Sequence, residues 1–338
     1  MKTSGSKELL SIISRSWCER HRPESESTDW GQSLAFYGLL RSLDHTNDPM
    51  VKEFVRRWVH FHLNEQVSVN YFCGSWSFGL LFPDIERHFP EVQVQLRATA
   101  GRIYDVITEK ALRNGNGLIL HNVDLPNLYI DTIYYSSVIL AKLGTYLKRE
   151  WKVDALLQLK GHLEILRDGK KPFFIHCEEN LGGKRSEGSW ARGNGWVMMT
   201  SAELLSQFKP NSSEFQYVRD EVFLPLATAL KKYQTPKGLW RTIIDDPSAY
   251  EETSASAMYL FALLRCRNLG ALPKSFDAVI AKAEQGLASY VNKSGAFMGV
   301  SEGTWPGTVT YYKSLSRGEW WWGTGAYLLA LSEGAGKP

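Results

Sequence analysis

The residues with the clearest chemical potential lie in short segments rich in carboxyl, aromatic and glycine residues. In one of them, Asp131 follows Tyr129-Ile130 and precedes Tyr134 and Tyr135. A carboxylate at the start of a helix is stabilised by the helix dipole. One interpretation of Asp131 is therefore an N-terminal cap with no part in catalysis. Aromatic neighbours that exclude water would instead raise its pKa into the range of a general acid. The local sequence leaves both roles open.

A second segment, WARGNGW at residues 190–196, combines a cation with flat aromatic faces. Arg192 supplies a planar fork for a carboxylate, and Trp190 and Trp196 offer surfaces on which a sugar ring can stack. We expect the two tryptophans to flank the guanidinium. The structural alternative is a glycine-rich helix start in which Arg192 pairs with Glu187. The combination of fork and stacking faces favours an acidic sugar as ligand.

Two histidines and one glutamate complete the candidate set. His121 and His176 lie upstream of Asp131 and Trp190 and have no third ligand at metal-binding spacing, so we expect them to contact sugar or tune a pKa, with no metal bound. Glu252 opens the block EETSASAM and is first of all a helix cap. A substrate-binding or catalytic role is its second interpretation.

Two kinds of helical segment alternate along the chain and must position these residues. Segments 7–21, 50–63, 94–112 and 154–166 carry apolar residues at three- and four-residue steps between charges, which is typical of helices with one buried face. The second kind is poor in charge, as buried helices are. It comprises residues 30–43, 76–81, 131–143, 196–205, 254–264 and 322–331.

The spacing of these buried segments predicts the architecture. Their first residues are 46 to 68 residues apart, which is room for two helices and their connections. Solenoid repeats are usually shorter, at about 20–45 residues, so a closed ring is favoured over an open array. We therefore expect an all-α, six-hairpin (α/α)6 barrel forming one domain over residues 1–338, with about twelve main helices. Short strand-like pieces at 171–177 and 238–246 would lie at its mouth.

Composition excludes several functional classes. The chain has 338 residues and a formal charge of +3, so it offers no surface suited to nucleic acid. No apolar run reaches the length of a membrane span, and the N-terminus is expected to be a helix, not a signal peptide. The four cysteines form no CxxC pair. We expect a soluble cytoplasmic protein, either a monomer or a homodimer.

Loops that lead into the inner helices should converge at one end of such a barrel and form the ligand site. They place Trp30 and Trp76 beside the residues already named as sugar contacts. Tryptophan is frequent here, with 12 residues in the chain, and several lie next to glycine. Flat amphipathic ligands such as sugar rings suit these side chains.

At these residues the chain resembles a known family. The run SWARGNGWVMMTSAELL (189–205) is similar to the signature of the unsaturated glucuronyl and rhamnogalacturonyl hydrolases, glycoside hydrolase families 88 and 105. Segments 120–144, 250–265, 299–306 and 321–334 resemble further blocks of the family in the same order. The resemblance implies a six-hairpin barrel and a substrate with a terminal 4,5-unsaturated uronic acid, left by a polysaccharide lyase.

The resemblance also implies a mechanism. Asp131 would protonate the vinyl-ether double bond, water would add at C5, and the resulting hemiketal would open and release the remaining oligosaccharide. His176, Trp190, Arg192 and Trp196 would hold the sugar ring and its carboxylate, and no metal or organic cofactor is implied.

One departure from the family pattern is clear. The family usually carries a second aspartate before the second inner helix, where this chain reads NYFCGSW at 70–76, with no carboxylate before Asp84. Another acidic residue could replace it, the substrate could differ, or activity could be reduced. Two further hypotheses stay open: ordinary glycoside hydrolysis by Asp131 and Glu252, and sugar binding without catalysis.

Overall fold

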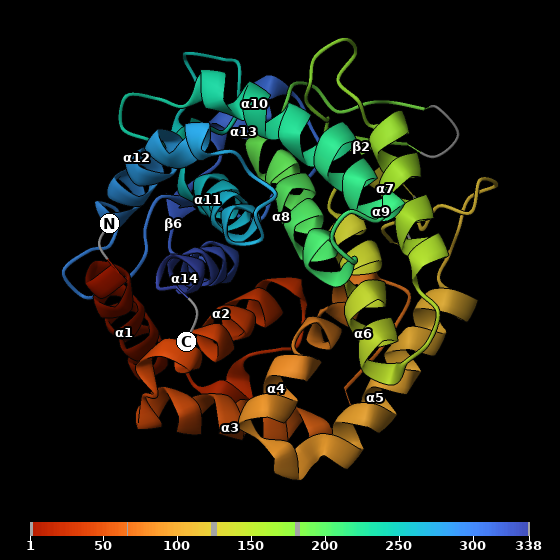
Figure 1. Ribbon diagram of the computed structural model, residues 1–338, viewed down its shortest axis with the longest axis vertical. Helices are drawn as coiled ribbons and strands as arrows, with labels where there is room; N and C mark the ends of the chain where they lie inside the picture. Colours follow the sequence, from red (N-terminus) through yellow and green to blue (C-terminus); the bar gives the residue numbers. More distant parts are fainter. Residues whose placement is uncertain (1–2, 66, 123–126, 180–182, 337–338) are drawn as a thin grey trace.

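The helices of the computed structural model form an outer and an inner ring (Figure 1). The structure describes residues 3–65, 67–122, 127–179 and 183–336. Each outer helix buries one stripe; in α3, for example, the buried residues Val51, Phe54, Val55 and Trp58 recur at steps of three and four or lie next to each other. The main outer helices are α1 (Thr3–Arg20), α3 (Pro49–Asn64), α5 (Gln93–Asp105), α7 (Lys152–Ile165), α10 (Leu224–Tyr233) and α12 (Asp277–Ala288).

The inner ring consists of the segments poor in charge. They are α2 (Trp30–Thr46), η2 (Cys73–Leu80), η5 (Tyr134–Val138) continued by α6 (Ile139–Leu147), α8 (Ala191–Gln207), α11 (Thr253–Asn268) and α14 (Trp321–Gly334). Each contacts the next in chain order, and α14 returns to α2. The expected all-α six-hairpin barrel is thereby confirmed. The second inner segment is a 3₁₀ helix, and η5 is a π-helix that begins three residues after Asp131.

Glycines close the ring where its first and last inner helices meet. A Cβ at Gly325 of α14 would lie 2.3 Å from the carbonyl oxygen of Leu34 in α2. A Cβ at Gly38 of α2 would lie 2.8 Å from the carbonyl oxygen of Gly325. Only hydrogen side chains allow the two backbones to come this close.

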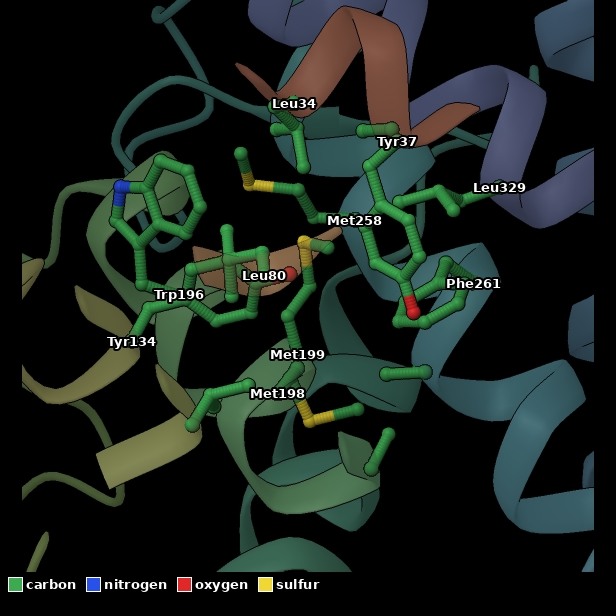
Figure 2. Packing of buried hydrophobic residues seen from close by; sticks show 14 of the residues in the cluster. Leu34, Tyr37, Leu80, Tyr134, Trp196, Met198, Met199, Met258, Phe261 and Leu329 are labelled. Atoms are coloured by element: carbon green, nitrogen blue, oxygen red, sulfur yellow. The ribbon is translucent and has the colours of Figure 1, made fainter. Parts of the chain in front are cut away.

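Side chains fill the centre of the inner ring. Figure 2 shows leucine, methionine and aromatic side chains from several inner helices packed against one another near the barrel axis. Deeper in the barrel, the buried carboxylate of Glu203 in α8 accepts a hydrogen bond from the Tyr37 hydroxyl (2.9 Å) and pairs with Arg265 and, at 3.7 Å, with Lys142. This network joins α2, α6, α8 and α11.

Short strands tie the loops together. The pairs are β1 (Leu128–Tyr129) with β2 (Cys177–Glu178), β3 (Trp240–Arg241) with β4 (Glu251–Glu252), and β5 (Val300–Ser301) with β6 (Arg317–Gly318). The expected strand-like pieces at 171–177 and 238–246 thus contribute only to the two-residue strands β2 and β3 and to isolated bridges.

The remaining helical elements are connections and helix ends. They are η1 (Pro23–Ser25), α4 (Phe82–His88), η3 (Pro90–Val92), η4 (Val106–Lys110), α9 (Ser213–Tyr217), η6 (Val218–Phe223), η7 (Lys274–Phe276) and α13 (Val309–Ser314). Within the described chain, no helix is both long and apolar enough to cross a membrane.

Candidate active site

A cavity of about 410 Å³ lies where the inner helices begin. Its walls come from the residues at or just before the N-terminal ends of α2, η2, η5 and α8, together with the loop before α13. Helix N-termini carry partial positive charge and favour an anionic ligand. The lining residues are Asp29, Trp30, Phe72, His121, Asn122, Tyr129, Asp131, Tyr135, His176, Trp190, Arg192, Gly303, Thr304 and Trp305.

Asp131 is a buried acid in this cavity. Its side chain keeps 15% exposure, and its Oδ2 has no hydrogen-bond partner among the described residues. Burial raises the pKa of this carboxyl from 3.8 to about 7, against the smaller lowering effects of the Arg192 charge and of the Trp196 indole. A carboxyl that stays protonated near neutral pH can act as a general acid.

The two expected histidines both line the cavity. His176 stacks on Trp190 (ring centroids 4.0 Å apart), contacts the Tyr312 hydroxyl through Nδ1 (3.2 Å), and holds Nε2 3.5 Å from Asp131 Oδ2. Burial, together with the positive charge of Arg192, lowers the pKa of His176 well below its usual value. His176 is therefore neutral and does not stabilise an ionised Asp131.

His121 lies on a second wall of the cavity. It stacks on Tyr129 (4.2 Å between ring centroids), and its Nδ1 lies 2.9 Å from Thr132 Oγ1 and 3.2 Å from Cys73 Sγ. Burial lowers the pKa of His121 to about 3, so this imidazole is also neutral. Both histidines offer neutral hydrogen-bonding groups to a ligand.

Arg192 is buried with its charge beside the cavity. Its guanidinium donates to the carbonyl (3.1 Å) and hydroxyl (2.6 Å) of Ser301, to the carbonyl of Glu302 (2.9 Å) and to the hydroxyl of Thr304. These acceptors are uncharged, so the positive charge is not neutralised by direct contact with a carboxylate. The expected alternative pair with Glu187 is absent, since Glu187 accepts a hydrogen bond from the Val309 amide.

The expectation that Trp190 and Trp196 flank the Arg192 guanidinium is wrong for Trp196. Its guanidinium lies over the rings of Trp190 (4.8 Å) and Trp322 (5.4 Å), so the second ring comes from α14, not from Trp196. Trp196 follows one helical turn after Arg192 in α8 and turns into the core against Tyr134 and Tyr135.

The rest of the RGNGW run is explained by packing. A Cβ at Gly193 would lie 2.8 Å from Ile130, and one at Gly195 would lie 2.7 Å from the Met258 sulfur. The Asn194 side chain exchanges two hydrogen bonds with the backbone of Phe174 (3.1 and 2.9 Å). The run therefore fixes the start of α8 against three neighbouring segments, at Ile130, Phe174 and Met258.

Three residues expected to contact the sugar are not among the residues that line the cavity. Trp76 is fully buried and donates its indole N–H to the Asn70 carbonyl (2.8 Å). Trp196 is buried in the core, as described above. Glu252 caps α11 through the amides of Ser254 (3.1 Å) and Ala255 (2.7 Å) and accepts from the Ser301 amide (2.9 Å), as its first interpretation predicted.

Other cavity residues were not selected from the sequence. Asp29 and Phe72 lie directly before inner segments, and Trp305, with 63% exposure, stands at the rim. Their position in the sequence could have identified them as cavity residues, since each occurs in a loop that leads into the barrel. No group of three or more histidine, cysteine or acidic residues suited to a metal ion occurs within the described residues. Residues 123–126, part of the segment compared with the family, lie outside them.

The chain is similar to known hydrolases, to one of them over most of its length. It is 28% identical over 317 residues to Unsaturated rhamnogalacturonyl hydrolase YesR of Bacillus subtilis, covering 90% of this chain and 89% of that protein. Over 149 residues (43% of this chain, 38% of the relative) it is 34% identical to Unsaturated 3S-rhamnoglycuronyl hydrolase of Formosa agariphila.

A solved structure shares the fold. The structure of a possible GH105 member from Salmonella enterica superposes with a TM-score of 0.88 at 20% identity, covering 98% of this chain and 94% of that one. Residues 11–335 match the family described as Glycosyl Hydrolase Family 88. The chain therefore belongs to glycosyl hydrolase family 88 and is a glycoside hydrolase.

Proposed function

We propose that this enzyme removes a terminal 4,5-unsaturated uronic acid from oligosaccharides by hydrating the double bond. The observation that carries the proposal is the environment of Asp131: a carboxyl whose pKa is raised to about 7 in a cavity, beside a neutral His176. An enol ether needs a proton on carbon, and an acid that stays protonated near neutral pH supplies one.

The proposed steps balance as an addition of water. Asp131 gives its proton to C4, the C4=C5 bond is consumed, and positive charge develops at C5 and the ring oxygen. Water adds at C5 and returns a proton to the Asp131 carboxylate. The hemiketal then opens at the bond between C5 and the ring oxygen, and the resulting hemiacetal at C1 releases the remaining oligosaccharide.

The charges around the cavity support an acidic sugar. Arg192 carries a buried positive charge whose hydrogen-bond partners are uncharged, and the starts of α2 and α8 lie at the same cavity. Both features favour a carboxylate. Aromatic side chains of Trp30, Trp190 and Tyr129 in the walls offer faces for the ring.

The names of the relatives suggest the neighbouring sugar. Two of them are named as unsaturated rhamnogalacturonyl and rhamnoglycuronyl hydrolases. We therefore propose an unsaturated uronic acid linked to rhamnose as the preferred terminal unit. Ordinary hydrolysis by Asp131 and Glu252 finds no support, because the Glu252 carboxylate is occupied in capping α11 and binding Ser301.

An absorbance assay tests the proposal. The purified protein is incubated with an unsaturated rhamnogalacturonan disaccharide, and the ultraviolet absorbance of the conjugated double bond is followed. We expect the absorbance to fall with the wild type and to persist with Asp131→Asn. A wild-type protein that leaves the double bond intact, or that cleaves the saturated disaccharide equally well, would exclude hydration.

A further inference from the structure

The cavity contains a second carboxylate that comes from an unexpected part of the chain. Asp29 lines the cavity together with Asp131, although it precedes the first inner helix. The second inner segment, where the resemblance led us to expect an aspartate, carries Cys73 and Gly74 instead. Among the described lining residues, Asp29 and Asp131 are the two carboxylates.

The Asp29 side chain reaches the site of the missing residue. Its Oδ1 would lie 3.0 Å from a Cβ built on Gly74, and the Phe72 ring would lie 2.4 Å from the same atom. Because Gly74 has no side chain, the side chains of Asp29 and Phe72 have room beside it. Burial raises the pKa of the Cys73 thiol and of the Tyr135 phenol, and the negative charges of Asp131 and Asp29 raise both further. Cys73 and Tyr135 thus lie within the electrostatic reach of both acids.

The hydrogen bonding of Asp29 differs from that of an ordinary helix cap. A capping carboxylate usually accepts from the second or third amide of its helix. Asp48 does so at the start of α3, where it binds the amides of Met50 (3.0 Å) and Val51 (3.3 Å). Asp29 accepts through Oδ1 from the adjacent Trp30 amide (2.8 Å). Capping therefore does not account for the position of its carboxylate at the cavity wall.

We propose that Asp29 is the second carboxylate of the active site, binding hydroxyl groups of the unsaturated sugar and stabilising the positive charge that develops after Asp131 has protonated C4. This inference rests on the proposed function. An ionised carboxylate suits the role because it attracts the developing cation without taking part in the proton transfer. In this assignment Asp29 acts in its ionised form, and Asp131 acts in its protonated form as the proton donor.

Burial raises the pKa of Asp29 above its usual value, with the Trp30 amide opposing the shift. Charged or titratable groups around it are Cys73, Tyr135, Asp131, His121, His176 and Arg192. The two histidines have pKa values lowered by burial and stay neutral, so protonation of Asp29 is expected to remove activity on the acidic side of the pH profile.

The test compares Asp29→Asn with Asp48→Asn. Asparagine at position 29 can still accept from the Trp30 amide, so the helix start is preserved while the charge is lost. We expect kcat/KM on an unsaturated disaccharide to fall roughly 10- to 150-fold, the range for a lost charge-assisted hydrogen bond, mainly through kcat. We also expect the acidic limb of the pH profile to disappear while the basic limb remains. Asp48→Asn should lower thermal stability and leave both kinetic constants unchanged.

The possible failures are distinguishable. A wild-type enzyme that leaves the double bond intact refutes the proposed function, and this inference with it. An active wild type with an equally active Asp29→Asn variant refutes the inference alone. A variant that loses stability but keeps wild-type kinetics and the acidic limb would show that Asp29 only caps α2.

Discussion

Replacing Asp131 by asparagine should make the enzyme inactive and, at alkaline pH, relatively more stable. In the unfolded chain this carboxyl has its ordinary pKa of 3.8, and burial raises it to about 7 in the folded protein. Between these values the folded state keeps a proton that the unfolded state has lost. The free energy of unfolding therefore falls as pH rises from about 4 to about 7.

The size of the effect follows from the shift. A change from 3.8 to about 7 corresponds to about 4 kcal/mol, since each pKa unit contributes about 1.4 kcal/mol. Water that enters the cavity reduces this value, because the side chain keeps 15% exposure. Asparagine has no charge to bury, so the variant should lack this pH dependence and gain up to that amount relative to the wild type between pH 4 and pH 8.

Urea unfolding of both proteins at a series of pH values measures the difference. The informative quantity is the change in the stability difference with pH, because it cancels any constant effect of the amide on packing. Stability curves that run parallel from pH 4 to pH 8 would refute a raised pKa at Asp131. Reduced stability of the variant with intact turnover would show that Asp131 is a helix cap.

Three further perturbations address the fold and the cation. Arg192→Lys should raise KM nearly as much as Arg192→Ala, because an ammonium group cannot bind all the backbone and hydroxyl acceptors at residues 301–304 at once. Initial rates measured over a range of substrate concentrations compare the two variants. Glu203→Gln should destabilise the protein by about 3–5 kcal/mol in urea unfolding, since it removes the carboxylate that pairs with buried Lys142 and leaves Arg265 with Glu333 alone; an unchanged midpoint would contradict this. Gly325→Ala should lower the melting temperature strongly, because its Cβ would lie 2.3 Å from the Leu34 carbonyl, and a variant as stable as the wild type would show that the ring closure tolerates a side chain.

Much of the fold was predictable because it depends on the spacing of apolar residues. Helices that are buried on all sides are poor in charge, and this property marked the inner ring directly. The 3₁₀ form of η2 and the π-helix at η5 were not predictable. They depend on how neighbouring helices pack, and propensity is a weak guide where tertiary contacts decide.

The site was harder to predict because residue type does not reveal direction. Trp190 and Trp196 both flank the RGNG run, yet Trp190 lines the cavity and Trp196 packs in the core. Glu252 and Asp29 both precede inner helices, yet Glu252 is occupied by capping and Asp29 reaches the cavity. Trp190 stands at the start of α8 and Trp196 lies inside it, whereas Asp29 and Glu252 both stand directly before their helices. The surrounding contacts, and not the position in the chain alone, therefore decide which way a side chain points.

The single domain expected for residues 1–338 stays a prediction. The main apolar core includes residues from Leu10 to Ala335, so most of the chain contributes to one cluster. Limited proteolysis should then yield no two independently stable halves.

The central claim, that Asp131 protonates the double bond before the oligosaccharide is released, can be tested by one nuclear magnetic resonance time course. The vinyl proton of an unsaturated disaccharide and the anomeric protons of the released sugar are followed in the same sample. Hydration predicts that the vinyl signal disappears no later than the released sugar appears, and that Asp131→Asn shows neither change. Release of the sugar while the freed uronic acid keeps its vinyl proton would mean displacement at C1 and would contradict the mechanism.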